Sequence, residues 1–211
     1  MIIEPFAGSA RYALRWFDRD VLLVDCRPVV VKTWHYLQAA STADILGLPE
    51  PKPGDDWDKL RLSEGERLLL GWLAGRGASH PRHSVQQFSH FKRDKKSIAG
   101  QLYKIKHWTI QQGDYRDISN QEATYFVDPP YFCGGHSYRT PALDYAALAL
   151  WCKSRQGQVI VCENTKADWL PFHPLRDLHG AQADTTEAIW SNHRTGFEAV
   201  QMAMELETAN R

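Results

Sequence analysis

The stretch Val127-Asp128-Pro129-Pro130-Tyr131-Phe132 places an acid, two prolines and an aromatic residue directly after an apolar run. Residues 124–127 are mostly β-branched or aromatic, which predicts a short buried strand. Proline has no backbone N–H, so the strand ends there and Asp128 lies at its tip. Proline also fixes φ and keeps the residue before it extended, so the Asp128 carboxylate and the Asp128 and Pro129 carbonyls present acceptors in one direction.

Acceptors in one fixed direction suit a planar amino group, because two hydrogen bonds to it increase the electron density on its nitrogen. Tyr131 adds a flat face on which a base ring can stack. The stretch is therefore a candidate site for an exocyclic amine. A plain strand that ends in a proline turn explains the same residues equally well, so the rest of the chain has to decide.

Length and composition set mild limits. The chain has 211 residues, which suits one domain with a full core, and equal numbers of basic and acidic residues, 25 of each. The charges are unevenly placed: residues 76–106 carry eight basic side chains and one acid, whereas residues 44–66 carry seven acids and three bases. A neutral total therefore hides two opposed faces.

Cysteine spacing and hydropathy bear on the compartment. The four cysteines lie far apart with no C-x-x-C pair, so neither a zinc knuckle nor a disulfide framework is indicated. No apolar run approaches the roughly 18 residues of a membrane span, and the N-terminus lacks a signal-peptide pattern. We expect a cytoplasmic protein with reduced thiols and no membrane association.

The N-terminus predicts a strand, an acid, a turn of small residues and a helix, over Met1-Ile2-Ile3-Glu4-Pro5-Phe6-Ala7-Gly8-Ser9-Ala10. Small side chains let a ligand approach the backbone, although an ordinary strand-to-helix turn has the same composition. A second apolar run ends at Asp25, about 20 residues after the loop, where nucleotide-binding α/β units bond ribose hydroxyls. A helix cap before Pro28 is the alternative for Asp25.

Two further predicted strands also end at acids, at Asp114 and Asp128. With Glu4 and Asp25, four strand ends therefore carry an acid, and in a doubly wound parallel sheet such ends share one edge, where these folds bind ligands. Residues 159–163 predict another strand. Residues 185–190 and 198–206 predict two late strands joined by a turn-rich connection.

Residues 41–96 leave the predicted sheet. They begin rich in Pro, Gly and Asp, continue as a helix with Ser63 as N-cap and Glu66 completing a capping box, and end basic and aromatic. Such residues contact phosphates and stack on bases, whereas a solvated loop and a charged helix face are the alternative. His80-Pro81-Arg82-His83 has no third ligand at a useful spacing, so no metal site is expected.

In this order, residues 4–8, Asp25, residues 113–115 and residues 128–131 resemble the DNA adenine-N6 methyltransferases. The chain looks most like the short phage-type members, in which the cofactor motif precedes the DPPY motif, and the resemblance covers nearly the whole chain. It implies an α/β fold, a Rossmann-like methyltransferase sheet that is mostly parallel with a C-terminal antiparallel hairpin. A catalytic domain of 1–40 and 97–211 would carry an inserted target-recognition region, 41–96.

The resemblance also implies S-adenosyl-L-methionine as cofactor and double-stranded DNA with a flipped adenine as substrate, in a bacterial host cell or at its nucleoid. Phe6 and Gly8 would lie along the methionine part of the cofactor. The implied cofactor-binding residues are Glu4, Pro5, Phe6, Ala7, Gly8, Asp25 (ribose), Asp114 and Tyr115 (adenine), and Asp128. The implied catalytic residues are Asp128 and Pro129, which accept from the N6 amine, Pro130, and Tyr131, which stacks on the base. The implied nucleic-acid-binding residues are Arg82, Lys92, Arg93, Lys95, Lys96 and Tyr138.

Two positions depart from the family's pattern. The usual glycine-lysine segment does not precede Ile2 in this sequence, so we expect that the chain is shortened there or that another segment fills its place. Ala10 stands where many members have a second loop glycine. RNA, cytosine N4 or a protein glutamine amide remain alternative substrates, and a nucleic-acid-binding or partner subunit that keeps the fold without turnover remains an alternative from another class.

Overall fold

A computed structural model describes residues 1–55, 57–75, 78–85, 90–133, 143–179 and 184–193. In chain order the elements are β1 (Ile2–Glu4), α1 (Arg11–Arg15), β2 (Val21–Asp25), α2 (Pro28–Ala39), α3 (Thr42–Gly47), η1 (Trp57–Leu60), α4 (Glu64–Ala74), α5 (Phe91–Ala99), η2 (Leu102–Ile105), β3 (Thr109–Gln112), η3 (Tyr115–Asp117), β4 (Ala123–Val127), α6 (Tyr145–Ser154), β5 (Gly157–Asn164), β6 (His173–His179) and β7 (Asp184–Ser191).

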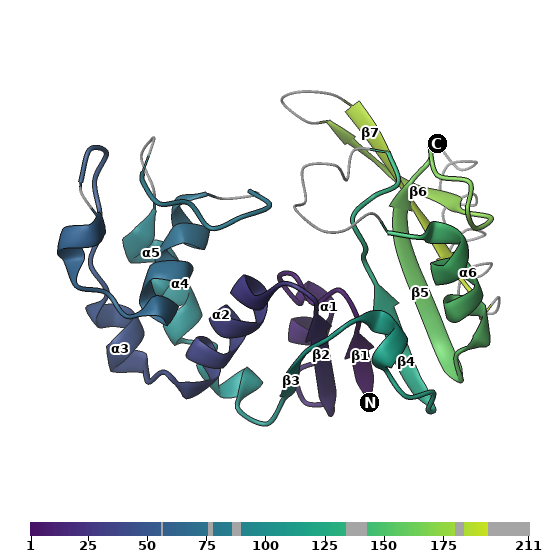
Figure 1. The fold of residues 1–211 in the computed structure, drawn as a ribbon, viewed down its shortest axis with the longest axis horizontal. Coiled ribbons are helices and arrows are strands. Elements are labelled where there is room, and N and C mark those ends of the chain that lie inside the picture. The colour runs from purple at the N-terminus through teal and green to yellow at the C-terminus, as the bar shows by residue number, and fades with distance from the viewer. Residues whose placement is uncertain (56, 76–77, 86–89, 134–142, 180–183, 194–211) are drawn as a thin grey trace, which may run out of the picture.

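The strands form one seven-stranded sheet in the order β3-β2-β1-β4-β5-β7-β6 (Figure 1). The first five strands are parallel, and β7 runs antiparallel to both β5 and β6. The order 3-2-1-4-5 is that of a doubly wound nucleotide-binding sheet. The predicted fold class, a mostly parallel Rossmann-like sheet with a C-terminal antiparallel hairpin, is therefore confirmed.

The hairpin is made from partly different residues than the sequence predicts. The strand expected at 185–190 is β7, but its hairpin partner is β6, and the partner expected at 198–206 lies outside the described residues. The sequence of β6, HPLRDLH, has a proline and no β-branched residue, so its pattern predicts no strand. Among the described residues β6 is the last strand of the sheet, where Pro174 is tolerated, and the pairing is irregular between Pro174 and Arg176.

The strand order reverses between β1 and β4. From β1 the sheet continues through β2 and β3 on one side, and from β4 through β5 on the other, while β1 and β4 pair directly. The carboxyl ends of these two strands flank the topological switch point, the usual ligand site of open α/β sheets. The predicted cofactor loop after β1 and the Asp128 turn after β4 therefore begin from neighbouring strands.

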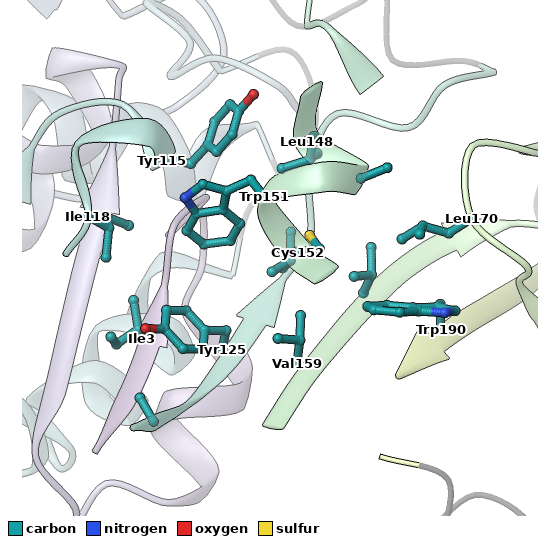
Figure 2. Packing of buried hydrophobic residues seen from close by; sticks show 14 of the residues in the cluster. Ile3, Tyr115, Ile118, Tyr125, Leu148, Trp151, Cys152, Val159, Leu170 and Trp190 are labelled. Carbon is teal, nitrogen blue, oxygen red and sulfur yellow. The ribbon is translucent and has the colours of Figure 1, made fainter. Parts of the chain in front are cut away.

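Both faces of the sheet are covered by helices, as parallel sheets require. Under α6, Trp151 packs edge-on against Tyr115 and Tyr125, with ring centroids 5.5 and 5.6 Å apart (Figure 2). A second core cluster, which includes Trp34 of α2 and Trp108, contains Leu23 of β2 and Ile110 of β3. The strand positions are thus held from both sides.

The helices α3, α4 and α5 lie beyond β3, at the other end of the molecule from β6 and β7 (Figure 1). They share a third core cluster that includes Ile45, Leu70 and Phe91. The predicted capping box of Ser63 and Glu66 begins α4. The helix α5 continues across residue 96, the expected end of the inserted region, and Ala99 and Leu102 belong to the same cluster.

Among the described residues, no helix combines the length and the apolar character that crossing a bilayer demands.

Candidate functional site

Five neighbouring parallel strands end at or within two residues of an acid. The acids after β1, β2, β3 and β4 are those that the sequence predicts, and β5 adds one that had no assigned role. In sheet order they are Asp114, Asp25, Glu4, Asp128 and Glu163. Because these strands are parallel, the acids lie along one edge of the sheet.

Glu4 is 2% exposed and its Oε1 accepts the Ala13 N–H at 2.7 Å. This bond ties the end of β1 to the first turn of α1, where N–H groups have no helical acceptor. Burial raises the pKa of Glu4 to about 8; the Ala13 N–H partly offsets this, and the charge of Asp128 adds to it. Glu4 and Asp128 are therefore close enough to interact electrostatically.

The loop after β1 is anchored to β2 and α2. Asp25 is buried; its Oδ2 accepts the Gly8 N–H at 3.2 Å and its Oδ1 accepts the Arg27 N–H at 2.9 Å. Trp34 Nε1 donates to the Gly8 carbonyl at 3.0 Å, and Ala7 N–H to the Val24 carbonyl at 3.0 Å. The loop therefore has a fixed path next to Asp25, and two of its own residues, Pro5 and Ala7, are buried.

Two residues of this loop have left-handed backbone. Gly8 has φ +43°, and a Cβ placed there would meet no heavy atom closer than 3.8 Å, so the conformation and not the space favours glycine. Ala10 has φ 46° and ψ 40°, which costs a non-glycine residue roughly 1–2 kcal/mol. Ala10 thus has a backbone conformation that favours glycine, at the position where many members of the family that the sequence resembles have glycine.

Aromatic packing connects the loop to the end of β3. The ring of Phe6 stacks on that of Tyr115, with centroids 5.7 Å apart and planes at 30°. Tyr115 itself is 4% exposed and belongs to the core. Asp114 accepts from the Arg116 guanidinium at 2.7 and 3.1 Å, and these hydrogen bonds lower the pKa of Asp114. Here the Asp114 carboxylate is bonded to Arg116.

The proline turn begins where the β4–β5 pairing ends, at Val127 opposite Val161. The Asp128 residue is exposed to solvent, yet the protein atoms around its carboxylate displace enough water to raise its pKa to about 6. The charges of Glu187 and Glu163 add to the rise. Burial and the charge of Asp128 also raise the pKa of the half-buried Tyr131 phenol. Tyr131 therefore stays a neutral aromatic ring beside a carboxylate.

Three side chains that the sequence analysis did not assign hold the residues after Pro129. Tyr145 Oη donates to the Pro130 carbonyl at 2.6 Å, Glu163 Oε1 accepts the Phe132 N–H at 2.6 Å, and Asn164 Nδ2 donates to the Cys133 carbonyl at 3.0 Å. Glu163 could have been found, because it ends an apolar strand just as the four predicted acids do. Tyr145 and Asn164 carry no comparable sequence signal.

The basic residues of the insert divide into two groups. Lys92, Arg93 and Lys96 are exposed on α5, and Arg82 is exposed in the segment before it. Lys95 is 5% exposed; its Nζ donates to the carbonyls of Leu48 and, at 3.3 Å, Leu46, and it lies 3.1 Å from Glu50 Oε1.

The assignment of Lys95 to nucleic-acid binding is therefore wrong, because its ammonium is used inside the protein at the end of α3. Tyr138, also predicted to contact nucleic acid, lies outside the described residues. Within the described part of the chain, no group of three or more His, Cys, Asp or Glu side chains is placed to hold a metal ion.

No protein-family model and no curated protein matches the sequence. Several solved structures are similar to this chain over most of its length. One is a candidate methylase from Haemophilus influenzae, with 10% identity and a TM-score of 0.40 over 90% of this chain and 85% of that one. A candidate methyltransferase from Escherichia coli has 11% identity and a TM-score of 0.39 over 89% and 73% of the two chains. The rRNA methyltransferase aviRa from Streptomyces viridochromogenes has 13% identity and a TM-score of 0.38 over 89% and 75%.

The raised pKa of Glu4 predicts a pH-dependent stability. Folding favours the protonated carboxyl, so its contribution is fully present below the ordinary value of 4.5 and is lost as the pH rises through about 8. In Glu4→Gln, which keeps an oxygen for the Ala13 N–H, this dependence should disappear. Between pH 5 and 8 the unfolding free energies of the two proteins should diverge by at most about 1.4 kcal/mol per pH unit, with the variant the more stable at pH 8. Unfolding free energies from urea denaturation that change with pH by the same amount in both proteins would contradict this prediction.

The buried ammonium of Lys95 predicts a loss of stability without it. Lys95→Met keeps the apolar stem but leaves the Leu48 carbonyl without its charged donor, and should lower the unfolding free energy by about 2 kcal/mol. The matched control is Lys96→Met on the exposed side of the same helix, which should stay within about 0.5 kcal/mol of the parent. Equal effects in urea denaturation would show that Lys95 has no such role.

Proposed function

We propose that this protein transfers a methyl group from S-adenosyl-L-methionine to the N6 amine of adenine in DNA. The observation that carries the proposal is the placement of the Glu4 to Gly8 loop and the Asp128-Pro129-Pro130-Tyr131 turn after two directly paired strands, β1 and β4, at the switch point. A cofactor site and an amine-binding turn on neighbouring strand ends are what a direct transfer between two bound molecules requires.

The residues at this edge fit such a cofactor. Its sulfonium and ammonium groups are cations. Four acids gather at this edge, as shown by their electrostatic interactions with one another or with Cys162: Glu4, Asp128, Glu163 and Glu187. In this proposal Asp25 would bind the ribose hydroxyls, and Phe6 and Gly8 would lie along the methionine part. Asp114 and the backbone of Tyr115 would contact the cofactor adenine, because the Tyr115 side chain is buried in the core. When bound, the cofactor supplies a methyl carbon activated by a positively charged sulfur.

The chemistry asked of the chain is orientation and charge. Asp128 and the Pro129 carbonyl would accept the two hydrogens of the amine, so its lone pair points away from them, toward the cofactor side. The nitrogen gains a carbon and becomes more positive before it loses a proton, and fixed acceptors stabilise that change without reorganising. Asp128 is the acceptor able to take the proton, and the neutral ring of Tyr131 would stack on the base.

An adenine inside a duplex cannot reach such a turn, so the base must be flipped out at a cost of a few kcal/mol. Exposed cations at Lys92, Arg93 and Lys96 on α5, and at Arg82 in the segment before it, would bind the phosphates and supply the sequence-independent part of the affinity. In Figure 1 these helices and the β6–β7 hairpin lie at opposite ends of the sheet, with the switch point between them. A duplex held by the insert would thus be anchored to one side of the proposed site.

The direct test is methyl transfer from labelled cofactor to duplex DNA, single-stranded DNA and RNA. Label should appear on adenine N6 of DNA, and Asp128→Ala should lower kcat by on the order of 10²- to 10³-fold, the loss typical of one stabilising group. Because the pKa of Asp128 in the free protein is about 6, kcat/KM for the cofactor, which reports the free enzyme, should rise with pH through that value. The control is Asp18→Asn, an exposed acid in the loop between α1 and β2 at the opposite edge.

Each other outcome has a defined meaning. Activity that survives in Asp128→Ala would remove the catalytic assignment. Label on cytosine N4 or on RNA would mean that the same site acts on another substrate. DNA binding by calorimetry without cofactor binding would favour a partner subunit that does not turn over.

The exposed cations predict a salt-dependent affinity. The double variant Lys92→Ala/Lys96→Ala should weaken duplex binding and reduce the slope of log affinity against log salt by roughly 1 to 2, as expected for up to two lost phosphate contacts. Lys153→Ala, an exposed lysine of α6, is the control and should leave the slope unchanged. An unchanged slope in the double variant would exclude α5 as the phosphate contact.

A further inference from the structure

The two prolines after β4 leave the described residues that follow, 128–133, without a strand partner. Pairing with β5 stops at Val127 opposite Val161, and neither Pro129 nor Pro130 has an N–H to continue it. The Phe132 N–H is instead bonded by a side chain, Glu163 Oε1, at 2.6 Å. Glu163 follows Val161 by two residues, just as Pro129 follows Val127, so it lies where the next pair of the two strands would have formed. Its carboxylate, and not a backbone carbonyl, accepts the Phe132 N–H.

The Glu163 carboxylate is itself fixed by burial and by hydrogen bonds to both of its oxygens. It is fully buried at 0% exposure, and both its oxygens accept hydrogen bonds from within the protein. Besides the Phe132 N–H, Oε1 accepts from Trp169 Nε1 at 3.2 Å, and Oε2 accepts the Asn164 N–H at 3.0 Å. A buried carboxylate with three N–H donors has little freedom to move, so it can fix the position of what it binds.

Two further bonds restrain the same segment. Tyr145 Oη donates to the Pro130 carbonyl and Asn164 Nδ2 to the Cys133 carbonyl, at 2.6 and 3.0 Å. We call Glu163, Tyr145 and Asn164 the post-proline clamp. All three act on residues 130–133, directly after the Pro129 carbonyl that the proposed reaction uses.

We propose that Glu163 is a positioning residue for the Asp128-to-Tyr131 turn, acting by its reach to the Phe132 N–H. Its kinetic consequence rests on the proposed methyl transfer, whereas its structural consequence does not. A misplacement of about 1 Å in an orienting group can cost roughly 10²-fold in rate. The competing role is electrostatic, because the Glu163 charge also acts on Asp128.

Two variants separate the hydrogen bond that Glu163 accepts from the Phe132 N–H from the effect of the Glu163 charge. Glu163→Gln keeps the length and an oxygen for the Phe132 and Trp169 N–H groups but loses the charge and the acceptor of the Asn164 N–H. Glu163→Asp keeps the charge but is one methylene too short. With duplex DNA at pH 8, where Asp128 is ionised, Glu163→Gln should retain kcat within roughly tenfold, and Glu163→Asp should lose on the order of 10²-fold, with the cofactor KM little changed in both. The opposite order would overturn the proposal in favour of charge.

Amide hydrogen exchange at Phe132 gives a readout that needs no activity. The amide should be protected in the parent protein and in Glu163→Gln, and exchange at least about tenfold faster in Glu163→Asp while the β4 and β5 amides stay unchanged. Unaltered protection in Glu163→Asp would overturn the proposal. If the parent shows no methyl transfer, the proposed function fails alone, and the exchange result still decides the role of Glu163.

Tyr145→Phe provides a second variant in case Glu163→Asp does not fold. It removes one hydroxyl from the clamp and keeps the ring that packs against Phe132 and Trp169. It should lower kcat by roughly tenfold and should not shift the pH profile, since no charge is removed. A pH shift, or unchanged kcat, would show that the clamp does not orient the turn.

Discussion

The pairing of β1 with β4 is the constraint on which the site depends. β1 has only three residues, all buried, and it is bonded on one side to β2 and on the other to β4. Its carboxyl end therefore cannot move relative to the Asp128 turn without disrupting the centre of the sheet. The strand is too short to be stable alone, so α2 and α6 must cover the two faces before the edge has a defined shape.

A row of acids at one edge is costly unless each is compensated, and the structure compensates them differently. Asp25 and Glu163 accept backbone and indole N–H groups, and Asp114 is paired with Arg116. At Glu4 burial outweighs the hydrogen bond from the Ala13 N–H, and at Asp128 the charges of Glu187 and Glu163 add to desolvation, so the pKa of each is raised. A bound cation would favour the ionised form of both groups. The repulsion between these acids would therefore also favour the binding of a cationic ligand at this edge.

Much of this could be predicted from the sequence, because the strongest signals are local. Apolar runs ending in acids located β1, β2, β4 and β5, and the small residues after Glu4 located the loop. What could not be predicted depends on long-range contacts. The role of Lys95 is decided by carbonyls of α3 almost 50 residues away, and helical spacing alone does not distinguish it from Lys96. The strand β6 forms because β7 is available to pair, against its own composition.

The boundary of the insert has a consequence for protein engineering. Ala99 and Leu102 share the core of α3 and α4, and Tyr36 and Leu37 of α2 pack against it, so the inserted helices and the sheet domain have no clean seam at residues 40 and 96. A chimera that exchanges this region with a relative would leave half-filled cores on both sides if it were cut there. A junction in the exposed turn near His107, with α2 taken along, would transplant the helices together with the surface on which they rest.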